Sequence, residues 1–238
     1  MAEPARRVRW VGSTASTQEL AHLLAETGVA HGVAIAAREQ VAGRGTRGRT
    51  WHSPLGGLWM SLVCRPREAA SVESLSLRVG LAVVEALEEV LTSLPPLAIK
   101  WPNDIHLDGR KLGGILCEAR WQGTELGWVV AGIGLNVSNP LPPEVAGTAI
   151  SLAQVVPGAD PETLADPVAD LVARRTREGG PLRPDEVAAL NRRDGLRDRR
   201  IASPLAGVAR GIDAGGALRV ETPGGEIRAV IGGTVELA

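Results

Sequence analysis

Residues 43 to 51, Gly-Arg-Gly-Thr-Arg-Gly-Arg-Thr-Trp, constrain the fold of this chain more than any other stretch. Glycines at three of these nine positions allow sharp turns and let backbone N–H groups approach a ligand closely. Apolar runs of strand type flank the stretch at 33–37 and 58–63. The sequence therefore predicts a loop held between two core strands, where binding sites usually lie.

The same loop carries three arginines and ends on a tryptophan. Planar guanidinium groups match the oxygen atoms of carboxylates and phosphates, and an indole offers a flat surface on which a ring can stack. This composition indicates an anion-binding loop with an aromatic wall. Two other interpretations of the loop stay open when it is taken alone. It could be a solvated basic loop, or a Gly-Arg segment that binds nucleic acid without order.

Composition limits the classes of function. The 238 residues suffice for one full core and a small appendage. A net charge of −1 counts against a dedicated DNA or RNA binder. No apolar run approaches the ~18 residues of a membrane span and no signal peptide precedes the first strand, so the expected compartment is the cytoplasm. Cys64 and Cys117, the only cysteines, fall in apolar strand candidates, so neither a disulfide framework nor a zinc site is expected.

The amino-terminal segment is typical of a strand followed by a capped helix. The strand is predicted to begin at Val8, and Ser16 with Glu19 three residues on is typical of a capping box. Gly28 ends the helix. The leucines predict its inward stripe, namely Leu20, Leu23 and Leu24.

Three polar side chains near this helix and the loop are candidates for ligand contacts. Capping accounts for Ser16 but leaves Thr17 and Gln18 available to face a ligand, without requiring it. Gln40 precedes the glycine-arginine loop by three residues. Its amide is either a loop staple or a ligand contact, and the spacing does not decide between them.

The longest helix is predicted over 71–94, where Pro95 and Pro96 stop it, and it is interpreted as core scaffold. A short strand at 97–101 follows. Because side chains alternate along a strand, Lys100 points away from the face that Ile99 and Trp101 share. A lysine in such a segment is usually a solvated edge residue.

Two further strands, 115–118 and 128–137, are predicted to pair across the turn at Gln122 and Gly123. Glycines interrupt this part of the chain at 113–114, 132 and 134. Glycine weakens a strand unless something must approach the backbone closely. Glycine-interrupted strands beside an arginine loop therefore indicate a binding site rather than packing alone.

The composition changes after residue 138, where a proline-rich loop begins. Asp166 and Pro167 are expected to be the N-cap and first residue of a helix, and a second short helix begins near Pro184. From Gly195 onward, short alternating runs separated by Gly-Gly pairs predict a small antiparallel barrel or meander. The domain boundary is placed near residue 194.

Taken together, four motifs resemble those of the biotin protein ligases, and they occur in that family's order. They are GRGTRGRTW at 43–51, KWPND at 100–104, KLGGIL at 111–116 and GIGLNV at 132–137, with STQ at 16–18 where the family usually has Ser-Thr-Asn. The resemblance covers nearly the whole chain. It implies an α/β (α+β) catalytic domain over 1–194, related to class II aminoacyl-tRNA synthetases, with a mixed sheet and flanking helices. It also implies a C-terminal Src-homology-3-like β-barrel over 195–238.

The reaction implied by this resemblance has two steps. The biotin carboxylate attacks the α-phosphate of ATP and gives biotinyl-5′-AMP and pyrophosphate. A lysine on a biotin carboxyl carrier protein or domain then attacks the mixed anhydride and releases AMP. Mg²⁺ would accompany ATP, and no tightly bound cofactor is expected. The residue types suit this chemistry, because the site must hold two anions in line and neutralise growing negative charge.

The resemblance also implies roles for single residues. Lys100 would be the main catalytic residue, bridging carboxylate and α-phosphate oxygens, and Arg44 would hold the same groups. The implied biotin-binding residues are Ser16, Thr17, Gln18, Gln40, Gly43, Arg44, Gly45, Thr46, Lys100, Gly114, Gly132 and Gly134. The implied ATP-binding residues are Arg44, Arg47, Arg49, Trp51, Lys100, Asn103 and Asn136. Lys111 contacts either the ligands or the carrier. No metal ligand is expected, since the histidines are interpreted as surface or loop residues: His22, His31, His52 and His106.

Three features depart from the family's pattern. Thr46 stands where many members have arginine, so faster leakage of the adenylate is expected. Gln18 replaces asparagine by a longer amide with the same donor and acceptor. The chain begins at the catalytic domain without a winged helix-turn-helix, so it is expected to be monofunctional with no sequence-specific DNA role. The family includes both monomers and homodimers.

Three rival functions remain from the sequence. The nearest is a lipoate or octanoate ligase or transferase on the same fold, disfavoured by the loop together with KWPND. An Arg-Gly-loop RNA-binding module conflicts with the near-neutral charge. A biotin-binding protein without catalysis would leave Lys100 and the arginines without a role.

Overall fold

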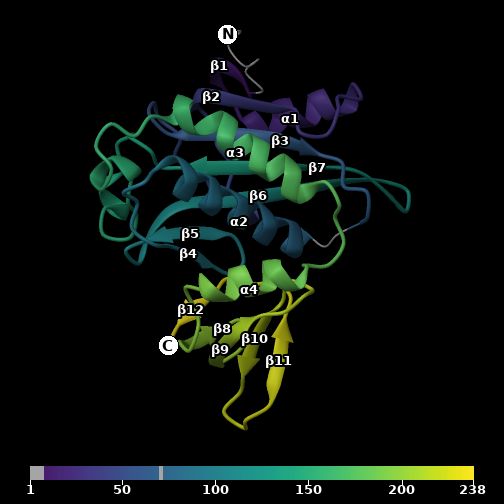
Figure 1. Cartoon of the computed structure of the whole chain (residues 1–238), viewed down its shortest axis with the longest axis vertical. Helices are drawn as coiled ribbons and strands as arrows, with labels where there is room; N and C mark the ends of the chain where they lie inside the picture. Colours follow the sequence, from purple (N-terminus) through teal and green to yellow (C-terminus); the bar gives the residue numbers. More distant parts are fainter. Residues whose placement is uncertain (1–7, 70–71) are drawn as a thin grey trace.

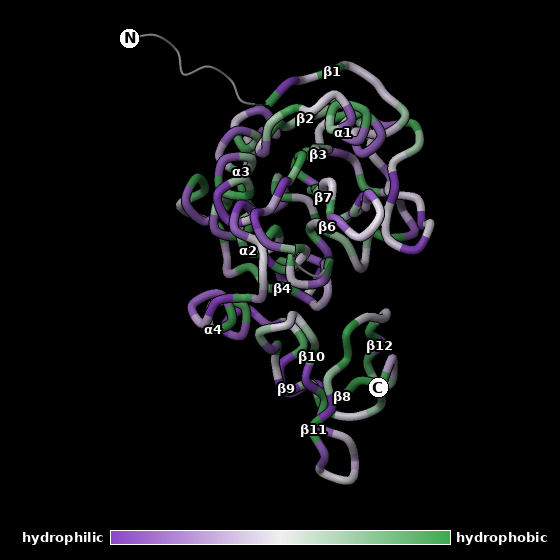
Figure 2. The backbone as a smooth tube through the Cα atoms, turned by 90° about the vertical axis from the view of Figure 1, so that its right-hand side faces the viewer, coloured by the Kyte–Doolittle hydropathy of each residue, from purple (hydrophilic) through white to green (hydrophobic). Residues whose placement is uncertain are grey.

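A computed structural model describes residues 8–69 and 72–238. Its main body is a seven-stranded mixed sheet flanked by helices, and a five-stranded antiparallel sheet follows at the C-terminus (Figures 1 and 2). This confirms the predicted fold class. In the described parts of the chain, no helix has the length and hydropathy to cross a membrane.

The main body contains β1 (Val8–Thr14), α1 (Thr17–Glu26), β2 (Ala34–Gln40), β3 (Leu58–Cys64), α2 (Val72–Val90), β4 (Leu97–Lys100), β5 (Asp104–Leu107), β6 (Arg110–Gln122), β7 (Glu125–Leu135) and α3 (Pro161–Thr176). The C-terminal part contains α4 (Pro184–Arg192), β8 (Arg200–Ser203), β9 (Gly207–Ile212), β10 (Leu218–Glu221), β11 (Ile227–Val230) and β12 (Glu236–Leu237). The sheet orders are β1-β2-β3-β7-β6-β5-β4 and β11-β10-β9-β8-β12. Only β1 and β2 pair in parallel among the described strands.

The two faces of the main sheet carry different layers. Every residue of β3 is buried, because α2 and α3 cover one face and α1 covers part of the other. Met60 and Leu62 belong to the core beneath α2 and α3, whereas Val63 packs beneath α1. Since α1 has only ten residues, it leaves the rest of its face of the sheet open. The candidate site lies on this open part.

The inward face of α1 differs from the prediction. Its buried residues are Thr17, Gln18, Ala21, His22 and Ala25, whereas the Leu23 side chain is 58% exposed. The expected inward stripe was therefore wrong at Leu23, whereas Leu20 and Leu24 are partly buried and pack against the apolar cluster beneath the helix. The helix directs small and polar side chains at the sheet, because part of this face borders a cavity. The expectation that His22 is a surface or loop residue was also wrong, because His22 lies on the buried face of the helix and contacts Trp128 and Glu118.

The start of α3 also differs from the prediction, which placed the N-cap at Asp166. The helix begins at Pro161, and Asp160 caps it by accepting a hydrogen bond from the Thr163 backbone N–H at 3.2 Å. Pro167 lies inside the helix. An Asp-Pro pair occurs twice in this segment, and the apolar face set by Leu164 and Val168 extends back to the earlier pair. Asp166 instead accepts a hydrogen bond from the backbone of Val8.

Other boundaries moved less. The long helix ends at Val90, before the predicted residue 94, and its predicted start at Ser71 lies outside the described residues. The glycine-bearing strand before the turn begins at Arg110 rather than 115. The alternating C-terminal runs form strands as predicted, but the sequence interpretation missed β8. His106 lies on β5, half-buried, rather than in a loop.

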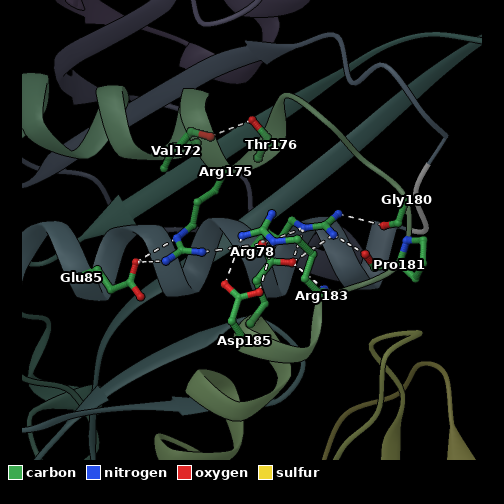
Figure 3. A network of polar contacts seen from close by, with 10 residues as sticks. Arg78, Glu85, Val172, Arg175, Thr176, Gly180, Pro181, Arg183 and Asp185 are labelled. Atoms are coloured by element: carbon green, nitrogen blue, oxygen red, sulfur yellow. Dashed lines mark hydrogen bonds and ion pairs between the residues drawn. The ribbon is translucent and has the colours of Figure 1, made fainter.

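A buried polar network ties α2 to α4 and to the segment just before α4 (Figure 3). Arg78 of α2 is 2% exposed and Glu186 of α4 is fully buried. Arg78 donates to both Glu186 carboxylate oxygens and to the backbone carbonyls of Gly180 and Pro181. This network fixes α4, and with it the start of the second sheet, against the main body.

Candidate active site

A cavity of about 530 Å³ occupies the open part of the sheet beside the N-terminus of α1. Its floor is the face of β6 and β7 that carries Gly114, Gly132 and Gly134. Its walls are the start of α1, the glycine-arginine loop and the segment 139–149 after β7. These regions are far apart in the sequence, and the cavity collects most of the predicted site residues.

The polar end of the cavity lies at the start of α1. Ser16 caps the helix by accepting a hydrogen bond from the Gln18 backbone N–H at 3.3 Å. The Gln40 side-chain oxygen accepts from the Thr17 backbone N–H at 2.8 Å, and the Gln40 amide nitrogen donates to Ser53 at 2.8 Å. Gln40 therefore connects the loop to α1, and it also lines the cavity.

Gln18 is bonded to the sheet through its whole side-chain amide. The nitrogen donates to the carbonyls of Leu116 and Val130, both at 3.2 Å. The oxygen accepts from the Ser61 hydroxyl at 3.0 Å. Ser61 also shares a hydrogen bond with the Thr17 hydroxyl at 2.9 Å. An asparagine at position 18 would be one methylene too short to copy this arrangement without a shift, so the longer amide has a structural use here.

The floor needs glycine because side chains already lie against it. A methyl group on Gly132 would stand 2.6 Å from the Gln18 side-chain oxygen, and one on Gly134 would stand 2.6 Å from Trp51 Nε1. Trp51 therefore lies over β7, and its indole nitrogen is buried with no hydrogen-bond partner among the described residues. Lys111 Nζ lies 5.2 Å from the centroid of the same ring, within cation–π distance.

The glycine-arginine loop has its own internal hydrogen bonds. Trp51 donates from its backbone to Gly43 at 2.9 Å, and Gly45 donates to Arg49 at 2.7 Å. The Arg49 guanidinium donates to the Thr46 hydroxyl at 2.9 Å. Thr46 thus bonds one of the loop arginines. Arg44 extends along the cavity and pairs with Glu118 at 3.2 Å.

The two lysines of the motifs lie in different places. Lys111 lines the large cavity and pairs with Asp104 at 2.7 Å. Lys100, on the edge strand β4, lines a neighbouring cavity of about 330 Å³. Arg47 lines that second cavity too and contacts Thr234 of the C-terminal part. The two cavities share lining residues: Thr46, Arg49, Asn103, Asp104 and Ile115.

At the other end of the large cavity, Asn136 is buried after β7. Its side-chain oxygen accepts from the Asn139 amide at 3.2 Å, and Asn139 in turn accepts from the Val137 backbone N–H at 3.1 Å. The Lys111 backbone bonds on both sides to this loop, donating to Thr148 and accepting from Ile150. The Asn103 side chain donates to the carbonyl of Ile115 at 2.8 Å.

Burial and neighbours shift the pKa of two groups near the site. A hydrogen bond from His22, opposed by burial and assisted by Arg44, lowers the pKa of the Glu118 carboxyl. Burial lowers the pKa of His106, against the effect of its hydrogen bond to Gly109. Both shifts favour an ionised Glu118 and a neutral His106 at neutral pH.

Several cavity residues were not found from the sequence. They are Ser61, Asp104, Asn139 and the segment 141–149, together with Glu118 behind the cavity. Ser61 had a visible signal, because it is the one polar residue in the otherwise apolar run of β3. Asp104 lies in a quoted motif. Asn139 bonds residues close to it in the sequence, Asn136 and Val137, but it falls outside the quoted motifs. Glu118 gave no signal, because its partners His22 and Arg44 are brought to it by the tertiary fold.

The fold and the site define a class of protein: an α/β domain whose cavity combines fixed cations with a glycine floor suited to a small organic anion. The chain belongs to the biotin/lipoate A/B protein ligase family, whose model matches residues 10–136. The model of the biotin protein ligase C-terminal domain matches residues 202–238.

Relatives and solved structures agree with this membership. The biotin–[acetyl-CoA-carboxylase] ligase of Paracoccus denitrificans is 34% identical over 211 residues, covering 80% of this chain and 85% of that protein. The bifunctional ligase/repressor BirA of Bacillus subtilis is 41% identical over 144 residues, which span 58% of this chain and 44% of that protein. The biotin protein ligase from Aquifex aeolicus, solved in complex with biotin and ATP, superimposes with a TM-score of 0.81 at 26% identity, covering 98% of this chain and 99% of that one.

Proposed function

We propose that this chain is a biotin protein ligase, which uses ATP to attach biotin to a lysine of a biotin carboxyl carrier protein or domain through biotinyl-5′-AMP. One observation carries the proposal: a single cavity brings the STQ segment, the glycine-arginine loop, Lys111, the glycine floor and Asn136 together. Its volume of about 530 Å³ lies within the range of small-molecule sites. The Aquifex aeolicus relative, solved with biotin and ATP, supports the choice of substrates.

The biotin half of the site would be the end beside α1. The hydroxyls of Thr17 and Ser61 share one hydrogen bond and line the cavity, so each can turn toward a ureido group. Ser16, Gln18 and Gln40 would shape this end, with backbone of Gly43, Gly45 and Thr46 at its rim. The bicycle would lie against the floor formed by Gly114, Gly132 and Gly134, with Trp51 as a movable wall.

The reacting groups would meet between the two ends. Arg44 and Lys111 both line the large cavity, so we assign to them the oxygens of the carboxylate and the α-phosphate. Lys100 and Arg47 line the neighbouring cavity, which Arg49 and Asn103 border as well. These four residues would serve the remaining phosphates of ATP, with Mg²⁺ bound to the nucleotide. The sequence-based assignment of the bridging role to Lys100 stays a prediction, and the experiment below compares the two lysines.

The adenine end would lie at Asn136 and the segment 139–149. Because the Asn136 oxygen accepts from Asn139, its amide nitrogen would be the group left to donate to a base. Catalysis would reside in residues 1–194 and the C-terminal sheet in 195–238, and the enzyme would act in the cytoplasm. A lipoate ligase is the second candidate, because the family model covers both kinds of ligase.

Pyrophosphate exchange into ATP tests the proposal directly. Purified protein is assayed with biotin, with lipoate and without an acid, alongside Lys111→Ala and Lys100→Ala. We expect exchange that requires biotin and falls by at least about 10²-fold in Lys111→Ala, as when one preorganised charge is removed from a transition state. A larger loss in Lys100→Ala would return the bridging role to that lysine. Exchange with lipoate but not biotin, or none with either, would refute the proposed function.

A further inference from the structure

Behind the cavity, four side chains form a chain of polar contacts from β7 to the glycine-arginine loop. The Trp128 indole N–H donates to His22 Nδ1 at 3.0 Å, and His22 Nε2 lies 3.3 Å from Glu118 Oε2. The same Glu118 oxygen lies 3.2 Å from Arg44 Nη2. We propose that Glu118 is a positioning residue of the ligase, which holds Arg44 at the cavity before the substrates bind. This inference rests on the proposed function.

The contacts fix the tautomer of His22. An indole N–H can only donate, so His22 Nδ1 must be the acceptor and carry no hydrogen. The ring hydrogen is therefore on Nε2, and it points to Glu118. His22 and Trp128 are both buried, so this contact lies away from solvent.

Glu118 is thereby prepared to hold a cation. Its Oε2 atom receives both the His22 N–H and the Arg44 guanidinium, and the hydrogen bond from His22 is the main reason its pKa is lowered. Its side chain is 28% exposed, so solvent screens the pair only in part. Glu118 lies two residues beyond Leu116 on β6, whose carbonyl holds Gln18. The same stretch of strand thus supports both the biotin end and the loop.

The geometry indicates preorganisation rather than sequestration of the arginine. Arg44 lines the large cavity while it is paired, whereas Glu118 does not line it. The recorded contact uses one of the five N–H donors of the guanidinium, which leaves others for an incoming anion. A side chain already held in place loses less conformational entropy when a ligand binds. The carboxylate also weakens the positive field of Arg44, but Lys111 and Arg49 supply further charge at the same cavity.

Positioning of Arg44 by Glu118 favours substrate binding, whereas weakening of the Arg44 field by the carboxylate opposes it. Mutation of Glu118 therefore shows which of the two effects is larger. Glu118→Gln keeps the size of the side chain and removes its charge. If Glu118 acts by positioning Arg44, this variant raises the KM for biotin by about tenfold and changes kcat by less than about threefold, because contacting charged residues couple at this level. In an Arg44→Ala background the same change has no further effect. Glu125→Gln, on the same β6–β7 hairpin but at an exposed position, is the matched control and keeps wild-type constants.

The test is a double-mutant cycle in the biotin-dependent pyrophosphate exchange assay, with thermal melts to show that each variant folds. Wild-type exchange that lacks dependence on biotin refutes the proposed function, and this inference falls with it. If the wild type shows biotin-dependent exchange but Glu118→Gln has an unchanged or lower KM for biotin, the positioning role is overturned and the proposed function stands. Effects of Glu118→Gln and Arg44→Ala that add independently also overturn it. If Glu118→Gln has no effect in the Arg44→Ala background, the positioning role is supported. A general loss of stability caused by Glu118→Gln would persist in that background.

Discussion

Substituting Arg78 should reveal how strongly the C-terminal part depends on a single buried ion pair (Figure 3). Arg78→Met keeps an unbranched apolar side chain, about as long as the aliphatic stem of arginine, but removes every donor. Glu186 then retains the Arg183 backbone N–H at 2.8 Å and two more distant guanidinium groups, Arg183 at 3.5 Å and Arg175 at 3.7 Å. The carbonyls of Gly180 and Pro181 lose their donor as well.

The expected loss follows from burial. Removing one partner of a buried ion pair leaves an uncompensated charge and costs about 3–5 kcal/mol. The remaining partners of Glu186 favour the lower end of this range. Because a domain is stable by only about 5–15 kcal/mol, the change should be plain in equilibrium unfolding by urea. The double variant Arg78→Met/Glu186→Gln neutralises the carboxylate as well, and it should recover more than half of the free energy of unfolding that Arg78→Met loses.

The structure supplies a matched control for this experiment. Arg67 pairs with Glu178 at 3.0 Å, but their side chains are 64% and 61% exposed. Arg67→Met should therefore cost less than about 1 kcal/mol, as for other exposed pairs. Equal losses in Arg78→Met and Arg67→Met would refute the argument. A double variant no more stable than Arg78→Met would show that lost packing, rather than an unpaired charge, sets the cost.

Three further changes test other parts of the structure. Gly134→Ala places a methyl group 2.6 Å from Trp51 Nε1, so the indole must move. We expect the KM for biotin to rise by about tenfold or more, a loss comparable to that of other overpacked sites, and the melting temperature to change little. Burial raises the pKa of Asp194, so the folded state binds that proton more tightly than the unfolded state, and stability falls as the pH rises through the folded-state pKa. Asp194→Asn keeps the oxygen that accepts from the Leu196 backbone N–H and removes the charge. It should therefore raise the free energy of unfolding by about 1–2 kcal/mol at pH 7. A gain in stability that persists below the pKa of the unfolded carboxyl would show that the buried charge is not its cause. Thr46→Arg should slow the release of biotinyl-AMP in a chase experiment, since Thr46 bonds Arg49 and brings no charge to the loop. Release as fast as in the wild type would show that position 46 does not retain the adenylate.

The sequence predicted those parts of the fold and cavity that depend on local chemistry. Glycine at 132 and 134 can be interpreted without coordinates, because a strand keeps such residues only where something lies close to it. The chain around Glu118 could not be predicted in this way. Its hydrogen bonds join residues 96 and 106 positions apart, and the single histidine within it has no motif. Likewise, the leucines of α1 predicted an inward stripe, whereas the structure buries Thr17 and Ala21 and leaves Leu23 exposed.

The error at α1 has the same physical origin as the cavity itself. A helix that packed leucines along its whole length would fill the face of the sheet and leave no room above Gly132. Here the first turn instead carries Thr17 and Gln18, which bond Ser61 and the strand carbonyls while bordering the open space. Further along, Ala21 and Ala25 pack on Val63 and Val130 and hold the helix in place. The helix thus exchanges apolar contact at its first turn for polar contact, and this exchange keeps the site open.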